Sequence, residues 1–217
     1  MRPARCRAPP VMSTESAPRR VALVLARFSA AAATPPGIDP DAFATACLAD
    51  SYEVLADLVD VGSGIAGPPE VEELLWPGAA RFPVDIGIRD LADRLTGEYD
   101  ELVIIPADAP DLPGLVLAKL FKVLHRVDLA VAPERGGPAA VALGLALPLA
   151  PWIPDEGLDL DRLRYPTLAA LAPSRSRVAL APDWHRLRTP ADLRRLDPGL
   201  EGWEETRALL AGTALGA

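Results

Sequence analysis

Short apolar runs alternate along the chain with stretches in which apolar residues recur every three or four positions. The strongest run is Leu102–Pro106, and a continuous run of this kind is typical of a strand buried on both faces of a parallel sheet. The Pro-Ala-Asp-Ala-Pro segment that begins at Pro106 ends it, because proline cannot donate to a strand ladder. Further strands are predicted at Val21–Ala26, Val59–Val61, Ala80–Pro83, Asp128–Ala132, Ala139–Leu145 and Arg177–Leu180.

Helices are predicted between these strands, where apolar residues recur with a helical period. Their expected ranges are Asp41–Leu58, Glu70–Leu75 (a short helix or turn), Ile86–Leu95, Pro113–His125, Leu158–Leu171, Thr189–Leu196 with Thr189 as N-cap, and Trp203–Ala211. Ser29–Pro40 and Gly62–Pro69 are rich in small residues and proline and are expected to be loops. Strands that alternate with helices predict an α/β fold, with three layers and a mostly parallel central sheet.

The length of 217 residues fits one α/β domain with tails. We expect residues 1–19 to be a disordered tail and residues 20–212 to form the domain. The tail carries arginines and prolines but no apolar stretch, so it does not match a secretory signal, and either Met1 or Met12 can be the start. The uncharged segment Gly136–Pro154 is interrupted by prolines, and no membrane span is predicted.

Composition narrows the range of functions. The net charge is −8, which argues against nonspecific nucleic-acid binding because that needs a positive face. Two cysteines and two histidines provide no disulfide framework, zinc site or histidine-rich metal centre. Cys47 lies on the apolar stripe of its predicted helix and is expected to be inert core. Almost all positive charge is arginine, so a local arginine cluster that binds phosphate stays open.

Asp108 and Asp111 follow the strongest predicted strand. In open α/β sheets, ligands bind at the carboxyl ends of strands, so we expect Asp108 to be solvent-accessible and to line a cleft. The alternative is that the aspartates cap the following helix. That alternative suits Asp111 better than Asp108, which lies further from the helix.

Three segments carry a resemblance to a known superfamily: Ile104–Leu112 (IIPADAPDL), Ala132–Leu145 (APERGGPAAVALGL) and Trp184–Leu196 (WHRLRTPADLRRL). Together with the order of predicted elements over roughly Val21–Leu196, they resemble the nucleotide-diphospho-sugar transferases. This superfamily has the Rossmann-like fold of nucleotidyltransferases and family-A glycosyltransferases. Within it, the chain looks most like the radical-SAM/selenodomain-associated glycosyltransferase-like proteins, and more distantly like phospholactate guanylyltransferases.

The resemblance implies that Asp108 is catalytic and holds Mg²⁺ or Mn²⁺ against nucleotide phosphates, since these ions take hard oxygen ligands. The partner positions depart from the pattern. Arg135 stands where relatives have aspartate before two glycines, and Arg186 and Arg188 stand where they have Asp-x-Asp. The loop after the first strand has Arg27 but no lysine. The metal site is therefore expected to be weak or absent.

Two functions stay open. One is a cytoplasmic bacterial nucleotide- or nucleotide-sugar-dependent transferase, of nucleotidyl- or glycosyltransferase type, with a degraded phosphate loop. The other is a noncatalytic ligand-binding or partner protein of the same fold. In both, the expected ligand is a nucleotide or another anionic small molecule, and the sequence does not determine the oligomeric state. The predicted ligand contacts are Arg27, Asp111, Arg135, Gly136, Gly137, His185 and Arg188.

Each of these contacts has a plainer alternative. The arginines at the altered motif positions either bind an anion through forked hydrogen bonds or lie on a solvated face. On such a face, Arg186, Arg188, Arg194 and Arg195 pair with Asp183, Asp192 and Asp197, and Arg135 pairs with Asp183 or Asp192. In the first case, Arg135 and Arg188 form a positive spot near Asp108. The two glycines either approach a ligand or make a tight turn, and His185 is either a base or a structural side chain. Trp152, Trp184 and Trp203 either stack on a ligand or pack in the core.

Overall fold

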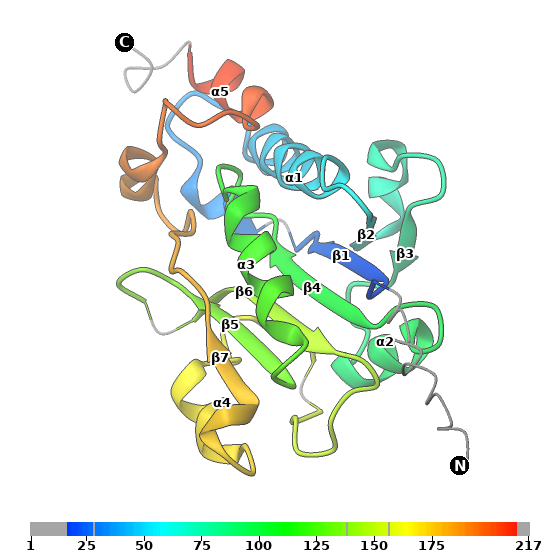
Figure 1. Ribbon diagram of the computed structural model, residues 1–217. Helices are drawn as coiled ribbons and strands as arrows, with labels where there is room; N and C mark the ends of the chain where they lie inside the picture. Colours follow the sequence, from blue (N-terminus) through cyan, green and yellow to red (C-terminus); the bar gives the residue numbers. More distant parts are fainter. Residues whose placement is uncertain (1–16, 28, 138, 156, 212–217) are drawn as a thin grey trace, which may run out of the picture.

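Seven strands form one sheet in the order β3-β2-β1-β4-β6-β5-β7 (Figure 1). The computed structural model describes residues 17–211 except residues 28, 138 and 156. All strand pairs are parallel except those that β6 makes with β4 and β5. The strands are β1 Arg20–Leu25, β2 Val61–Ala66, β3 Ala80–Phe82, β4 Glu101–Pro106, β5 Leu129–Pro133, β6 Ala140–Ala146 and β7 Val178–Leu180.

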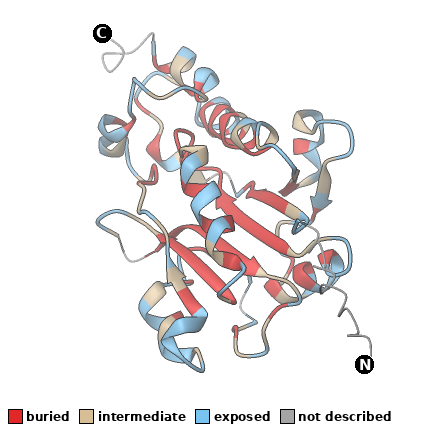
Figure 2. Ribbon diagram, viewed as in Figure 1, coloured by how far each residue is buried: buried red, intermediate tan, exposed pale blue. Residues whose placement is uncertain are grey.

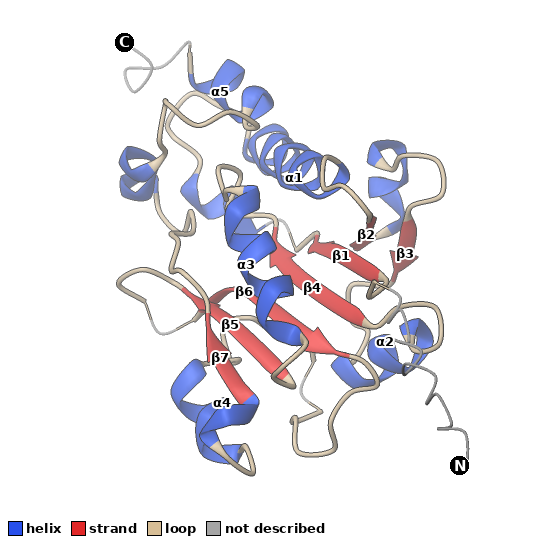
Figure 3. Cartoon of the chain, viewed as in Figure 1, coloured by secondary structure: helices blue, strands red, loops and turns tan. Residues whose placement is uncertain are grey.

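Helices connect these strands and cover the sheet (Figure 3). The α-helices are α1 Pro40–Ala56, α2 Ile88–Leu95, α3 Gly114–Leu124, α4 Tyr165–Leu171 and α5 Glu204–Leu210. Short 3₁₀ helices are η1 Ser29–Ala33, η2 Pro69–Leu74, η3 Arg175–Arg177 and η4 Pro190–Arg195. Thr189 caps η4 in a capping box with Asp192, as the sequence predicts.

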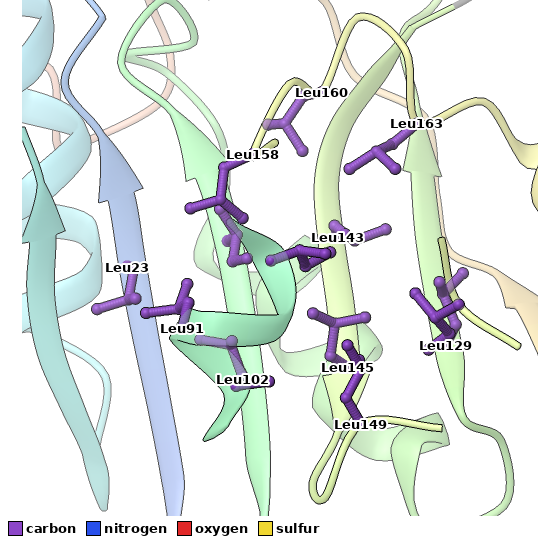
Figure 4. Close-up of a cluster of buried hydrophobic side chains, with 14 of the residues drawn as sticks. Leu23, Leu91, Leu102, Leu129, Leu143, Leu145, Leu149, Leu158, Leu160 and Leu163 are labelled. Atoms are coloured by element: carbon purple, nitrogen blue, oxygen red, sulfur yellow. The ribbon is translucent and has the colours of Figure 1, made fainter. Parts of the chain in front are cut away.

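The central strands β1, β4, β5 and β6 are buried on both faces, so the expected three-layer α/β fold is confirmed (Figure 2). On one face, α1 and α3 pack against inward-facing residues such as Val24 and Val103. On the other, α2, α4 and residues 147–155 and 157–163 cover a cluster that includes Leu23 and Leu102 (Figure 4). Burial on both faces explains why β4 is apolar at nearly every position.

The second strand differs from its prediction. The sequence Val61–Ala66 is VGSGIA, and its glycines led to the expectation of a loop from Gly62, whereas the whole stretch is β2. A Cβ at Gly64 would lie 2.5 Å from the Ala80 carbonyl oxygen and 2.6 Å from Leu23 Cδ2. Glycine is therefore present because neighbouring strands and side chains leave no room, and not because the backbone turns.

The predicted helix Leu158–Leu171 is only half correct, because α4 begins at Tyr165. Pro166 lacks the N–H that a helix interior needs but fits the first turn of a helix. The residues before it form an extended and turning segment that sends Leu158, Leu160 and Leu163 into the core (Figure 4). Their alternation with polar residues is the pattern of an extended chain.

The expected disordered tail, residues 1–19, lies mostly outside the described residues. Arg19 is described, and its guanidinium and backbone N–H both donate to Asp100. Within residues 17–211, apart from the three gaps, no helix has the length and apolar character needed to cross a bilayer.

The strand order places a topological switch at β1. Its neighbours β2 and β4 lie on opposite sides and are reached by connections that run in opposite directions along the sheet. Because β1, β2, β4, β5 and β7 all run parallel, their carboxyl ends meet at one edge of the sheet. A crevice at the carboxyl edge beside such a switch is the usual ligand position in open α/β sheets.

Candidate functional site

Asp108 follows β4 at this carboxyl edge, as predicted, but it is fully buried, so the expectation of a solvent-accessible carboxylate is wrong. The Arg186 guanidinium contacts both carboxylate oxygens, with Nε–Oδ1 at 2.6 Å and Nη2–Oδ2 at 2.8 Å. Ser29, in η1, donates its hydroxyl to Oδ2 at 2.6 Å. Both oxygens of Asp108 therefore have protein donors, and neither aspartate caps α3, whose N-cap is Pro113 without a side-chain bond.

A network extends from this pair. Arg186 also donates from Nη1 to Asp161 Oδ1, at 2.7 Å, and to the Ala140 carbonyl oxygen, at 3.3 Å. Arg188 holds Asp161 at two points and Glu134 at two points. The loops that follow β1, β4, β5 and β7 are thereby joined to the segment before α4.

The charges of this network nearly balance, with one negative charge in excess. Hydrogen bonds from Arg188, together with the charges of Arg186 and Arg188, lower the pKa of Asp161 to about 2. The same contacts with Asp161 and Glu134 raise the pKa of Arg188. Three carboxylates, those of Asp108, Glu134 and Asp161, surround two guanidinium groups, so the formal charge is −1. The expected positive spot at Arg135 and Arg188 is therefore wrong.

The residues around Asp108 do not fit the divalent cation that the resemblance implies. Each carboxylate oxygen already accepts a hydrogen bond from Arg186, and a metal ligand would have to give up that contact. Among the described residues, no group of three His, Cys, Asp or Glu side chains is arranged to hold a metal ion.

Arg27 is the predicted contact that does lie open at the edge. It follows β1, is exposed, and makes no side-chain hydrogen bond or ion pair with any described residue. It lines a small cavity of about 60 Å³ together with Ser29, Asp161 and Arg186. It also lines an open hollow of about 470 Å³ with Ala26, Pro68, Val84 and Asp85, at the ends of β1, β2 and β3.

The loops that follow β1 and β2 approach each other closely beside Arg27, and Gly67 makes this approach possible. A Cβ at Gly67 would lie 2.8 Å from the Ala26 Cβ, so only glycine permits this approach. A larger groove of about 610 Å³ lies between α1, α5 and Trp76, and none of the predicted site residues lines it.

Asp111 and His185 are brought together but are buried. Asp111 accepts from Trp184 Nε1 at 3.1 Å and from the backbone N–H of Asp197 at 3.2 Å, so its predicted role as a helix cap is wrong. His185 Nε2 lies 3.1 Å from Asp111 Oδ1, although the direction of the contact makes no hydrogen bond. Their ligand-binding role stays a prediction, whereas burial favours the structural alternative for His185.

Arg135 does not join the network around Asp108. Its guanidinium pairs with Asp183 at 3.1 Å and lies over the Trp184 ring, on an exposed surface, as the solvated-face alternative predicts. The glycines that follow turn the chain from β5 to β6, with Gly136 at a φ of 77°. A Cβ at Gly137 would lie 2.5 Å from Glu134 Oε2, so this glycine leaves room for the Glu134 carboxylate that pairs with Arg188.

Other sequence-based interpretations concern the core. Cys47 is buried, and burial raises the pKa of its thiol to about 12, in agreement with an inert core cysteine. Trp203 is buried, and Trp152 donates to Asp128.

No sequence pattern pointed to Ser29, Glu134 and Asp161 as members of the network, or to Arg186 as the partner of Asp108. The predicted helix Leu158–Leu171 includes Asp161 and therefore does not bring it to this edge of the sheet. The alternation Leu158-Asp159-Leu160-Asp161 was the available signal, since it marks an extended segment with carboxylates on one side. No local signal pairs Asp108 with Arg186, which lies 78 residues away.

The chain is similar in structure to several solved proteins, of which the first named here has a TM-score above 0.5. A protein from Desulfovibrio desulfuricans G20, assigned as a nucleotide-diphospho-sugar transferase, has a TM-score of 0.62 and 17% identity over 89% of this chain and 97% of its own. A cytidylyltransferase from Leptospira borgpetersenii has a TM-score of 0.47 and 11% identity, over 88% and 91% of the two chains. For 4-diphosphocytidyl-2C-methyl-D-erythritol synthase the values are 0.46 and 14%, over 81% and 95%.

A scan against family profiles finds no match, and neither does a search of curated proteins. At these identities the structural likeness establishes the fold. The resemblance to radical-SAM-associated proteins and to phospholactate guanylyltransferases stays a prediction.

Proposed function

We propose that this protein binds the phosphates of a nucleotide or nucleotide-sugar at the carboxyl edge of the sheet, beside β1. The observation that carries the proposal is Arg27, an exposed guanidinium that is unpaired among the described residues. It follows β1 and lines both the small cavity and the open hollow at the carboxyl edge. A permanently charged, forked donor at this position suits a phosphate. The fold shared with a nucleotide-diphospho-sugar transferase supports a nucleotide as the ligand class.

The surroundings of Arg27 add selectivity to this binding. Asp85 faces the larger hollow, and Asp159 and Asp161 line the smaller one. Carboxylates accept hydrogen bonds from ribose hydroxyls and from base or sugar donors, and they repel bare polyphosphate. A nucleotide whose sugar and base occupy the acidic part of the site therefore fits better than inorganic phosphate alone.

Binding without catalysis by Asp108 is the function that the geometry favours. A metal-holding or proton-transferring carboxylate needs a free oxygen, and both oxygens of Asp108 are engaged by Arg186 and Ser29. A transferase is the second candidate. Its supporting observation is that Ser29 and Arg186 line the small cavity, so a ligand there can reach the partners of Asp108.

Titration calorimetry with CTP, GTP, UDP-glucose and GDP-mannose, each with EDTA or with Mn²⁺, tests the proposal. We expect at least one of these ligands to bind, and Arg27→Ala to weaken it about tenfold or more, since a charged hydrogen bond contributes roughly 1.5–3 kcal/mol. Arg94→Ala is the matched control, because Arg94 is exposed in the last turn of α2, away from both hollows. No binding by any of the four, or equal losses in both variants, would contradict the proposal.

The same ligands separate the two candidates. Incubation of the bound ligand with the protein, followed by chromatography, shows whether a phosphate or sugar bond is cleaved. Turnover that is lost in Asp108→Asn would favour the transferase. Binding without turnover would favour the noncatalytic protein.

A further inference from the structure

The Arg186 guanidinium occupies a position that is lined by oxygen atoms. Two carboxylate oxygens of Asp108 and one of Asp161 lie 2.6–2.8 Å from its nitrogens, and the Ala140 carbonyl oxygen lies at 3.3 Å. The side chain of Arg186 is only 5% exposed and that of Asp108 is fully buried. These oxygens come from three separate segments of the chain, and the guanidinium is the group that they share.

We propose that Arg186 fills a latent divalent-cation site, so that the protein holds Asp108 in place without a metal ion and gains a metal site when residue 186 is shortened. This inference goes beyond the proposed function, because it concerns which cation neutralises the buried carboxylates and does not depend on a nucleotide. Because Arg186 already occupies this position, we expect ligand binding at this edge of the wild-type protein to be insensitive to Mg²⁺, Mn²⁺ and EDTA.

Charge supports this assignment. Asp108, Glu134 and Asp161 carry three negative charges, against which Arg186 and Arg188 supply two positive ones. Removal of Arg186 changes the formal charge of the network from −1 to −2, which one divalent cation neutralises. A buried carboxylate without a partner is costly, so the shortened variant has a strong tendency to recruit a cation.

The chemistry of the donors identifies the class of cation. Carboxylate and carbonyl oxygens are hard ligands, which suit Mg²⁺, Mn²⁺ and Ca²⁺ and do not select for zinc or copper. Bonds from Mg²⁺, Mn²⁺ or Ca²⁺ to oxygen are about 2.0–2.6 Å long. The present nitrogen–oxygen contacts with Arg186 are 2.6–2.8 Å for the carboxylates, so the carboxylates must move closer to bind an ion. Asp161 is 49% exposed and lies outside regular helix and strand, but both its oxygens accept from Arg188, so it reaches the ion by loosening those hydrogen bonds.

The test uses two measurements on each variant and on the wild type. Electron paramagnetic resonance measures Mn²⁺ binding, and thermal unfolding measures the change in melting temperature that Mn²⁺ causes. Arg186→Ala opens the position, and Arg186→Gln opens it while leaving an amide that can hydrogen-bond to Asp108. Arg186→Lys keeps a positive charge there. Arg135→Ala removes the same charge from an exposed pair and serves as the matched control.

We expect Arg186→Ala and Arg186→Gln each to bind one Mn²⁺ at least tenfold more tightly than the wild type, and their melting temperatures to rise with Mn²⁺. Arg186→Lys and Arg135→Ala should behave as the wild type does. Adding Asp108→Asn to Arg186→Ala should abolish the gain.

Two outcomes would overturn the proposal. One is that neither opened variant binds Mn²⁺ better than the wild type, including the case in which both stay unfolded with about 5 mM Mn²⁺. The other is that the wild type itself binds Mn²⁺ tightly through Asp108. No nucleotide takes part, so this result and that of the Arg27 titrations can fail independently.

Discussion

Arg188 meets Asp161 at two points, with Nη1–Oδ2 at 2.9 Å and Nη2–Oδ1 at 2.6 Å. This contact joins the segment before α4 to the loop after β7 and sits over the more deeply buried pair of Asp108 and Arg186. Arg188 also holds Glu134 at the end of β5. The carboxyl edge of the sheet is therefore closed on one side by ion pairs and open on the side of Arg27.

The first prediction concerns stability in acid. The pKa of Asp161 is lowered to about 2 in the folded protein, so folding favours the ionised form. The resulting stability is present above about pH 4 and is lost as the pH falls toward 2. Because the side chain is 49% exposed, we expect only about 1 kcal/mol from it. Urea unfolding at pH 7 and pH 3 should show a smaller loss in Asp161→Asn than in the wild type, and parallel losses would refute this account.

The second prediction concerns Asp50 and has the opposite sign. Asp50, buried in α1, accepts from the backbone N–H groups of Glu205 and Thr206 at the start of α5. Burial raises its pKa to about 6. The folded protein therefore binds an extra proton between about pH 4 and pH 6, and this contribution to stability is lost as the pH rises through that window.

Asp50→Asn removes the titration and keeps one acceptor oxygen. Relative to the wild type, the free energy of unfolding of the variant should rise by about 1–3 kcal/mol between pH 4 and pH 7. Asp39→Asn, at the exposed N-cap of α1, is the control and should show no such change. A constant difference between Asp50→Asn and the wild type across this range would show that Asp50 does not titrate there.

The third prediction concerns the buried pair. Arg186→Met leaves Asp108 buried without a cation and should cost about 3–5 kcal/mol of stability. Adding Asp108→Asn removes the remaining charge, so the double variant should be more stable than Arg186→Met alone. Chemical denaturation measures both. For the exposed pair Arg135 and Asp183, each single alanine variant should cost no more than about 1 kcal/mol. A double variant less stable than Arg186→Met would contradict the prediction.

The fourth prediction concerns Gly64 in β2. Gly64→Ala would place a Cβ against the Ala80 carbonyl and Leu23, and we expect a loss of about 1–3 kcal/mol from the forced shift. Gly157→Ala is the control, since no heavy atom lies within 4 Å of its added Cβ. Thermal or urea unfolding compares them, and equal stabilities would mean that the strands relax without cost.

Two of the sequence-based predictions are wrong for the same reason. The glycines in β2 predict a loop, although Gly64 is there because of close packing between strands. The position of Asp111 near the start of α3 predicts a helix cap, although its carboxylate accepts from Trp184 and Asp197 instead. In both cases the nearest sequence neighbours suggested one cause, and a distant segment supplied another.

The sequence by itself determined the α/β class, most strands and helices, and the position of Asp108 after the central strand. These follow from local apolar patterns and proline positions, which act within about 10–15 residues. Only the tertiary structure decided that Asp108 is buried and which charges meet it. Its partners Ser29 and Arg186 lie 79 and 78 residues away, and they reach it because parallel strands bring their carboxyl ends to one edge of the sheet. No local pattern encodes these contacts. Only the folded chain therefore distinguishes the exposed guanidinium of Arg27 from the buried guanidinium of Arg186, which is paired with Asp108.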